Sequence, residues 1–126
     1  MKQSNNLNNN KYKKYITDDY GNKRWYLNGE LHREDGPAIL CHDGDKRWYL
    51  NGKRHREDGP AVIYANGCKF WYLNGKLHRE DGPAILYQNG DKYWCLNGKF
   101  ITEAEHKQRT QVNIFVALHK ALKNAN

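Results

Sequence analysis

Apolar and polar positions alternate along this chain in short stretches that end in glycine turns. Residues 46–50 (Lys-Arg-Trp-Tyr-Leu) have the two-residue period of a half-buried β-strand, and similar stretches recur along the chain. Each stretch is followed by Asn-Gly, the strongest short hairpin signal, because a type I′ turn requires positive φ at both central positions. The pattern therefore predicts a series of antiparallel hairpins. These dipeptides are Asn28-Gly29, Asn51-Gly52, Asn74-Gly75 and Asn97-Gly98.

The hairpins belong to a repeat, because the tryptophans at positions 25, 48, 71 and 94 are equally spaced. Full units begin at Gly21, Gly44 and Gly67, and a partial unit begins at Gly90 and ends after Phe100. Such arrays stack unit on unit instead of enclosing one pocket. We therefore expect a mostly β protein: an elongated antiparallel β-meander of 23-residue hairpin repeats, forming a single-layer twisted sheet with one C-terminal α-helix.

A second turn signal precedes each tryptophan strand. If it is also a two-residue turn, it places Val62 opposite Trp71 and Ile63 opposite Phe70. The Asn51-Gly52 turn likewise places Trp48 opposite His55, and Lys46 opposite Glu57. The Asp-Gly-Pro sequence of each unit predicts a kink, because proline cannot donate to a strand ladder. The second turn signals are Asp43-Gly44, Asn66-Gly67 and Asn89-Gly90.

The two ends differ from the repeats. Residues 1–10 are rich in asparagine and predict a disordered tail, and the repeat array is expected over 11–102. Residues 103–126 contain neither glycine nor proline, and their apolar residues follow helical spacing. Thr102 is a candidate N-cap, so we expect a capping helix over 103–126 that covers the last edge strand.

Composition narrows the possible functions. The net charge is +7, but the basic excess lies mainly in residues 1–24 and 94–126, so the array lacks the continuous basic stripe typical of nucleic-acid binding. No apolar run is long enough to span a membrane or to act as a signal peptide. Three cysteines, Cys41, Cys68 and Cys95, occupy different phases of the repeat, which indicates free thiols in a reducing, cytoplasmic compartment. No cofactor is predicted.

The His-Arg-Glu-Asp sequence recurs three times and combines a proton shuttle, a cation and two acids. A metal site and a catalytic site are both considered, but no nucleophile recurs beside it and the fourth unit has Ile101 in place of the histidine. A structural role explains more: the histidine packs over the tryptophan, and the glutamate pairs across the strand with a lysine. The residues expected to be structural are Trp25, Trp48, Trp71, Trp94, His32, His55, His78, Lys46 and Glu57.

Positions that differ between units are the better candidates for partner binding, since a scaffold repeats while a binding surface must be individual. Exposed tyrosine, phenylalanine and arginine are also the residue types that anchor protein interfaces. The alternative is drift on a solvated face. The candidate partner-binding residues are Arg24, Tyr26, Arg47, Tyr49, Arg54, Phe70, Tyr72, Tyr93 and Phe100.

The sequence Gly44-x-x-x-Trp48-Tyr49-x-Asn51-Gly52-Lys53, which recurs once per unit, resembles the MORN repeat. It is most similar to the variant form found in bacterial antitoxin-like proteins and in phage and giant-virus proteins. The resemblance covers roughly residues 12–101 and departs after the turn, where His-Arg-Glu-Asp stands in place of further glycines. It implies an elongated, twisted single-layer sheet used for protein contact or self-association, sometimes for lipid contact, and it supplies no catalytic residues.

We therefore expect a non-enzymatic interaction protein that binds and inhibits or scaffolds another protein. The resemblance favours an antitoxin or a phage-type inhibitor of a host defence system such as a CRISPR nuclease, so the expected partner is a defence nuclease or a toxin. Self-association into a homo-oligomer would cover an exposed aromatic face. The alternative is nucleic-acid binding by the aromatic and basic residues of the sheet. Membrane-surface binding by the basic helix is a further alternative.

Overall fold

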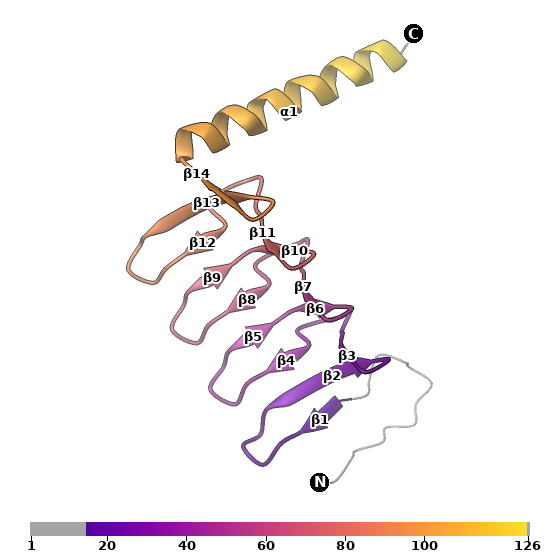
Figure 1. Ribbon diagram of the computed structural model, residues 1–126, viewed down its shortest axis with the longest axis vertical. Helices are drawn as coiled ribbons and strands as arrows, with labels where there is room; N and C mark the ends of the chain where they lie inside the picture. Colours follow the sequence, from indigo (N-terminus) through magenta and orange to yellow (C-terminus); the bar gives the residue numbers. More distant parts are fainter. Residues whose placement is uncertain (1–14, 126) are drawn as a thin grey trace.

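The computed structural model describes residues 15–125, so the predicted tail over 1–10 and the start of the array lie outside the described range. The described chain is mostly β, with 14 short strands in an antiparallel, meander-like arrangement followed by one helix (Figure 1). The sheet does not close into a barrel, and the units follow one another along the long axis of the molecule. The predicted fold class is thus confirmed.

One long sheet runs through all units. Its strands pair in the order β1-β2-β4-β5-β8-β9-β12-β13-β14, and β3 pairs with β2 beside this path. All strand pairs are antiparallel, and the chain leaves the sheet through a short hairpin between β2 and β4, between β5 and β8, and between β9 and β12. The strands are β1 (Tyr15–Thr17), β2 (Lys23–Leu27), β3 (Glu30–Leu31), β4 (Ile39–Leu40), β5 (Lys46–Arg47), β8 (Val62–Ile63), β9 (Lys69–Phe70), β12 (Ile85–Leu86), β13 (Lys92–Leu96) and β14 (Lys99–Ile101).

Two small hairpins stand beside the long sheet as separate two-stranded sheets, because the tryptophan strand is interrupted at its tryptophan in the second and third units. They are β6 (Tyr49–Leu50) with β7 (Lys53–Arg54), and β10 (Tyr72–Leu73) with β11 (Lys76–Leu77). Trp48 connects the two sheets: its N–H donates to the carbonyl of Ala61, directly before β8, and its carbonyl accepts from the N–H of His55, directly after β7.

The Asn-Gly turns have the predicted geometry. Asn51 and Gly52 have φ of 51° and 75°, and the three equivalent turns match them. Positive φ at both central residues defines a type I′ turn, for which asparagine and glycine are the preferred residues. The predicted register is confirmed here, with Leu50 opposite Lys53 and Tyr49 opposite Arg54.

The turns before the tryptophan strands differ from the prediction by one residue. Val62 lies opposite Phe70 and Ile63 opposite Lys69, so the expected Val62–Trp71 and Ile63–Phe70 pairs are wrong. The loop has three residues, because Tyr64 N–H donates to the Cys68 carbonyl and Gly67 N–H donates back to the Tyr64 carbonyl. Gly67 at the end of the loop has a positive φ of 96°, which is usual for the last residue of a three-residue hairpin loop. A shift of one residue moves side chains to the opposite face.

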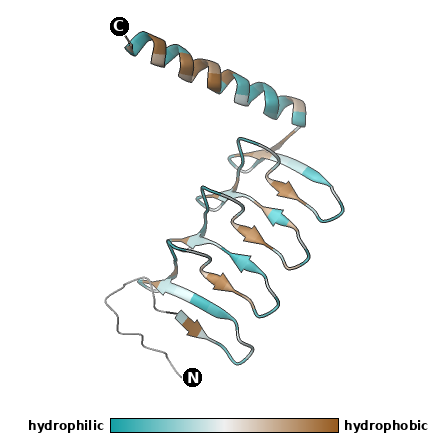
Figure 2. Ribbon diagram, turned by 180° about the vertical axis from the view of Figure 1, so that it is seen from behind, coloured by the Kyte–Doolittle hydropathy of each residue, from teal (hydrophilic) through white to brown (hydrophobic). Residues whose placement is uncertain are grey.

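The core is a narrow line of small and β-branched residues that repeats with the units. The alanine of each Gly-Pro-Ala sequence has no exposed surface, and the residue after it is also buried. Figure 2 shows the result, with hydrophobic strands alternating with hydrophilic ones along the long sheet. These core residues are Ala38, Ile39, Ala61, Val62, Ala84 and Ile85.

Helix α1 (Glu103–Asn124) begins at Thr102, whose side chain accepts a hydrogen bond from the Glu105 N–H. His106 is the buried residue of this helix, and its Nε2 donates to the Arg79 carbonyl at 2.6 Å. Beyond this docking point the apolar side chains of α1 stay exposed, Phe115 and Leu122 by 71% each. The predicted helix is present, but it extends away from the array instead of covering the last edge strand along its length (Figure 1).

Candidate functional site

The His-Arg-Glu-Asp sequence of each of the first three units forms what we call the arginine lock, in which the arginine covers the tryptophan of the same unit. In the second unit the Arg56 guanidinium lies 4.0 Å from the Trp48 ring centroid, within cation–π range. Its Nε donates to Asp58 at 3.0 Å and its Nη1 donates to the Pro60 carbonyl at 3.1 Å. Gly59 lies against the guanidinium and has to be a glycine, because a Cβ there would lie 2.9 Å from the guanidinium carbon. Arg33 over Trp25 and Arg79 over Trp71 repeat the arrangement.

The histidines join neighbouring units. His55 Nδ1 accepts the N–H of Asn74, from the Asn-Gly turn of the next unit, at 2.9 Å. His32 and His78 do the same for Asn51 and Asn97. The prediction that histidine packs over tryptophan is therefore wrong: arginine covers the ring, and histidine links the units.

The predicted Lys46–Glu57 pair is also wrong. Lys46 lies opposite Leu40 and Ile63 in the long sheet, while Glu57 lies 3.5 Å from the Nε2 of its own His55. The cause is the break at Trp48, which separates the lysine strand from the segment that carries the glutamate. The other units have equivalent His–Glu contacts. The described copies of this sequence therefore place their polar groups in scaffold contacts.

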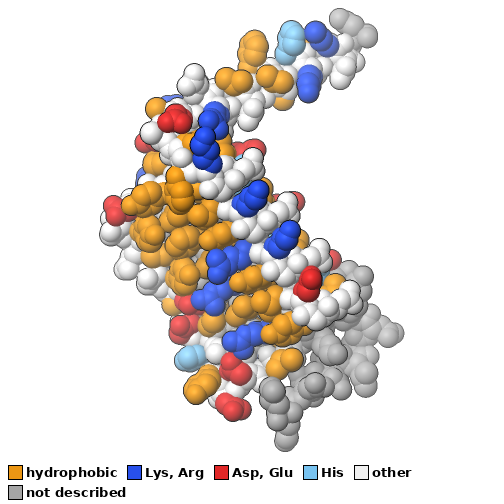
Figure 3. All heavy atoms as spheres, viewed as in Figure 1, with side chains coloured by type: hydrophobic (Ala, Val, Ile, Leu, Met, Phe, Trp, Pro, Cys, Tyr) orange, Lys and Arg blue, Asp and Glu red, His pale blue; other side chains and the backbone are white. Residues whose placement is uncertain are grey.

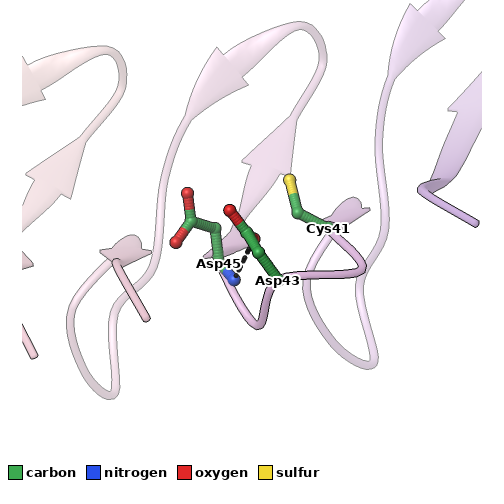
Figure 4. Close-up of side chains that lie close together, drawn as sticks. All are labelled: Cys41, Asp43 and Asp45. Carbon is green, nitrogen blue, oxygen red and sulfur yellow. Dashed lines mark hydrogen bonds between the residues drawn. The ribbon is translucent and has the colours of Figure 1, made fainter. Parts of the chain in front are cut away.

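One group could be considered for metal binding. Ligand atoms of Cys41, Asp43 and Asp45 lie within 4.8 Å of one another (Figure 4). Both carboxylates already accept backbone hydrogen bonds, Asp43 from the Asp45 N–H and Asp45 from the Ala65 N–H. Burial raises the pKa of the Cys41 thiol, so the thiolate that a metal requires is disfavoured. These groups are accounted for by turn structure.

A row of side-chain pairs lies at the three-residue turns. The same two positions of the repeat form each pair, but the residue types differ from unit to unit, unlike the repeated scaffold contacts described above. The first pair is an ion pair, with Arg24 Nη1 3.0 Å from Asp18. In the second pair Arg47 lies 4.0 Å from the Cys41 sulfur. The third and fourth pairs are aromatic and edge-to-face: Tyr64–Phe70 and Tyr87–Tyr93, with centroids 5.5 and 5.8 Å apart.

The aromatic pairs continue into one another, and together with Phe100 they form what we call the aromatic row: Tyr64, Phe70, Tyr87, Tyr93 and Phe100. The Phe70 and Tyr87 centroids are 5.9 Å apart, and those of Tyr93 and Phe100 are 6.5 Å apart. The last three rings are exposed by 40%, 46% and 58%. Figure 3 shows the hydrophobic side chains gathered over this part of the long sheet.

Basic residues border the aromatic row. Arg47 lies over the Tyr64 ring at 5.7 Å and joins the row to the polar pairs. Arg54 donates to the Tyr49 and Tyr72 hydroxyls at 3.3 Å each, and the hydrogen bond with Tyr49 raises the pKa of Arg54. Lysines at equivalent positions of three hairpins, Lys53, Lys76 and Lys99, are exposed. Basic side chains also lie beside the hydrophobic ones in Figure 3.

The structure brings together some of the predicted partner-binding residues and separates others. Phe70, Tyr93 and Phe100 belong to the aromatic row, and Arg47 borders it. Tyr49, Arg54 and Tyr72 form a half-buried cluster on the small hairpins. Arg24 takes part in the ion pair described above, and Tyr26 lies opposite Leu31 on β2, partly buried.

Two members of the row, Tyr64 and Tyr87, were missed by sequence reasoning. A two-residue turn at Asn66-Gly67 would place Tyr64 opposite Lys69, on the face away from Phe70. The three-residue loop returns it to the Phe70 face. The available signal was the recurrence of tyrosine at the same position of two adjacent units.

Comparison with known proteins finds no matching family model, no matching curated protein and no matching solved structure. The resemblance to the MORN repeat therefore stays a prediction. Within residues 15–125, no helix is both long enough and apolar enough to cross a membrane.

Proposed function

We propose that this protein is a non-enzymatic interaction module that binds another protein through the aromatic row. The observation that carries the proposal is the contrast between identical scaffold positions and the aromatic row, whose positions carry other residue types in other units and in which Tyr87, Tyr93 and Phe100 are exposed. Tyrosine and phenylalanine present large rigid surfaces, and edge-to-face contacts hold the rings in place before binding. Little conformational entropy of these side chains is therefore lost when a partner binds.

The surroundings of the row indicate what its partner should carry. Arg47 borders it on one side and Lys53, Lys76 and Lys99 line the neighbouring hairpins. A partner with an apolar centre and an acidic rim would match both features, since charges at a rim guide association while buried rings supply affinity. The resemblance to antitoxin-like and phage repeat proteins supports a toxin or a host defence nuclease as that partner, with inhibition by blocking as the mechanism.

The histidines support the non-enzymatic part of the proposal. In His32, His55 and His78 the Nδ1 atom accepts a backbone N–H and the Nε2 atom faces a glutamate 3.3 to 3.5 Å away. A general base needs an accessible lone pair within reach of substrate. These imidazoles use theirs to hold neighbouring units together.

Nucleic-acid binding is the second candidate, favoured by the closeness of stacking surfaces and exposed lysines. Bases stack on aromatic rings at about 1–3 kcal/mol each, and phosphates require the adjacent basic groups. Its signature is a steep loss of affinity with salt, because phosphate contacts release counterions.

The test begins with the tagged protein in cells in which its gene is expressed. A protein partner should co-purify at about 0.5 M salt, which screens exposed charges. Replacing Tyr93 and Phe100 together by alanine should weaken binding at least about thirty-fold, the loss expected of a hot spot worth about 2 kcal/mol. Tyr20→Ala is the matched control, because Tyr20 is 77% exposed and lies outside the row.

Three outcomes distinguish the alternatives. Equal binding by the double variant and the control would contradict the proposed surface. Capture of nucleic acid that is lost at high salt and in a Lys53→Glu, Lys76→Glu variant would favour the second candidate. A dimer that the double variant dissociates, measured by sedimentation, would identify a second copy as the partner.

A further inference from the structure

The fourth tryptophan lacks the cover that the first three share. Arg33, Arg56 and Arg79 lie 4.0, 4.0 and 3.9 Å from the ring centroids of Trp25, Trp48 and Trp71. Within residues 15–125, no arginine or lysine is stacked on Trp94 in this way. The cause lies in the sequence, because the position of the fourth unit that is equivalent to Arg79 is Thr102.

Helix α1 follows β14 where the other units have a loop, but it does not fill the space beside Trp94. Thr102 caps the helix, and His106 stands at the position equivalent to Pro83 and anchors the helix to the Arg79 carbonyl. A groove of about 660 Å³ remains between α1 and the loop of the third unit, with Trp94 in its wall. In the two preceding grooves, which Trp48 and Trp71 line, an arginine of the chain itself already covers the ring.

The charge of the groove favours a cation. Three carboxylate residues line it, Glu80, Asp81 and Glu103, against one lysine, Lys107. Asp81 already accepts from Arg79 Nε at 2.9 Å and Glu80 lies 3.5 Å from His78 Nε2, so Glu103 is the carboxylate on which an incoming cation mainly depends. All three are exposed at the groove surface, so a cation can reach them without crossing a barrier. On the α1 side of the groove, Ile114 and Ala117 lie beside the polar Thr110 and Asn113, and they provide apolar surface for an aliphatic stem.

We propose that this groove binds an arginine side chain of a partner protein, with the guanidinium stacked on Trp94 as the chain's own arginines stack on the other three tryptophans. Glu103 balances the charge, and Ile114 and Ala117 contact the methylene stem. Arginine is preferred over lysine because a planar guanidinium stacks on a ring and a compact ammonium does not. The site lies apart from the aromatic row: Trp94 and Tyr93 are adjacent on β13, and adjacent strand residues face opposite sides.

The proposal is tested by titrating the full protein with N-acetyl-arginine methylamide while recording the four indole N–H signals by NMR. Signals are assigned with single Trp→Phe variants. We expect the Trp94 signal to shift saturably, with a dissociation constant on the order of 1–10 mM for a single residue. The other three signals should stay in place, since their rings are already covered.

The matched probe is the citrulline analogue, which has the same shape without the charge. It should bind at least about ten-fold more weakly, a difference of about 1.4 kcal/mol. Glu103→Gln, an exposed change, should weaken arginine binding several-fold and leave the melting temperature unaltered. Equal responses to arginine and citrulline, equal shifts of all four indoles, tighter binding of the lysine analogue, or no shift at about 50 mM probe would each overturn the proposal.

Discussion

The three complete units and the fourth, partial unit share a strand and a turn but differ in the segment after the turn. After Asn51-Gly52 the chain forms a loop in which Arg56 stacks on the Trp48 ring and packs against Gly59. After Asn97-Gly98 it passes through β14 into a 22-residue helix. The same hairpin therefore has two different continuations in one molecule.

The difference shows that the loop is the part of the repeat that closes a unit. Gly59 leaves room for the arginine, Pro60 supplies a carbonyl to it, and Ala61 has no exposed surface. The fourth unit has Glu105, His106 and Lys107 at these positions, and this sequence continues a helix. Where the lock is missing, a tryptophan face and an apolar helix surface stay open to other molecules.

The largest effect is expected at the buried alanine. Ala61→Leu inserts a side chain where no surface is exposed, so it should lower the free energy of unfolding by about 3 kcal/mol. The equivalent position of the fourth unit is Lys107, which is exposed on α1, and Lys107→Leu should be nearly neutral. Urea unfolding of both variants measures the contrast. Equal destabilisation would mean that the fourth unit is closed like the others.

Removing the arginine lock should have the next largest effect. Arg56→Ala loses the stacking on Trp48 and two charged hydrogen bonds, at an expected cost of about 2 kcal/mol. Arg56→Lys keeps the charge but not the planar fork, so its stability should lie between the two. Trp48 fluorescence in a single-tryptophan background should shift to the red as the ring becomes exposed. A lysine variant as stable as the original would show that charge alone matters.

The histidine link should contribute less. His55→Ala leaves the Asn74 N–H without its acceptor, which should cost about 1 kcal/mol. Glu57→Ala and Lys46→Ala, both at exposed positions, should each change stability by less than about 0.5 kcal/mol. Thermal unfolding of the three variants tests this order. A coupling energy between Lys46 and Glu57 in a double-mutant cycle would contradict the structure and support the cross-strand pair that the sequence predicts.

The ion pair Asp18–Arg24 and the aromatic pair Tyr87–Tyr93 should differ in how their contribution to stability changes with pH. Burial acts to raise the pKa of Asp18, but hydrogen bonds from Asn22, Arg24 and Tyr20 lower it to about 2 from its usual 3.8. Because the folded-state pKa is depressed, the stabilisation is present above pH 3.8 and is lost as the pH falls through about 2. The melting-temperature difference between the original protein and Asp18→Asn should therefore shrink on acidification. The difference for Tyr87→Leu should not, because that pair carries no charge in this range.

The smallest effect is expected on the helix. Phe115→Ser with Leu122→Ser alters two side chains that are each 71% exposed, so the stability of the array should change by less than about 0.5 kcal/mol. Urea unfolding followed by tryptophan fluorescence reports on the array, since the four tryptophans lie outside α1. A clear destabilisation would indicate that α1 supports the array beyond its docking point at His106.

The sequence determined the parts of the fold that depend on local chemistry. The Asn-Gly turns, the repeat period and the start of the helix at Thr102 follow from backbone preferences of a few residues, and all were predictable. The register at Gly67 was not, because two- and three-residue loops both accept Asn-Gly, and that one residue decides the position of Tyr64. The sequence did not predict that Arg56 covers Trp48 while His55 binds the next unit. This arrangement depends on the break in the strand at Trp48, which is a tertiary feature.

The hydrogen bonds between units have a consequence for how such a chain can change in length. Each histidine reaches the asparagine 19 residues ahead, as His32 does with Asn51 and His55 with Asn74, so every junction joins the same atoms at the same separation. Duplication or deletion of one whole repeat unit reproduces both of its junctions intact, whereas a segment of any other length breaks one. The length of the array can therefore change only by whole repeat units, while its two ends, and what they bind, stay the same.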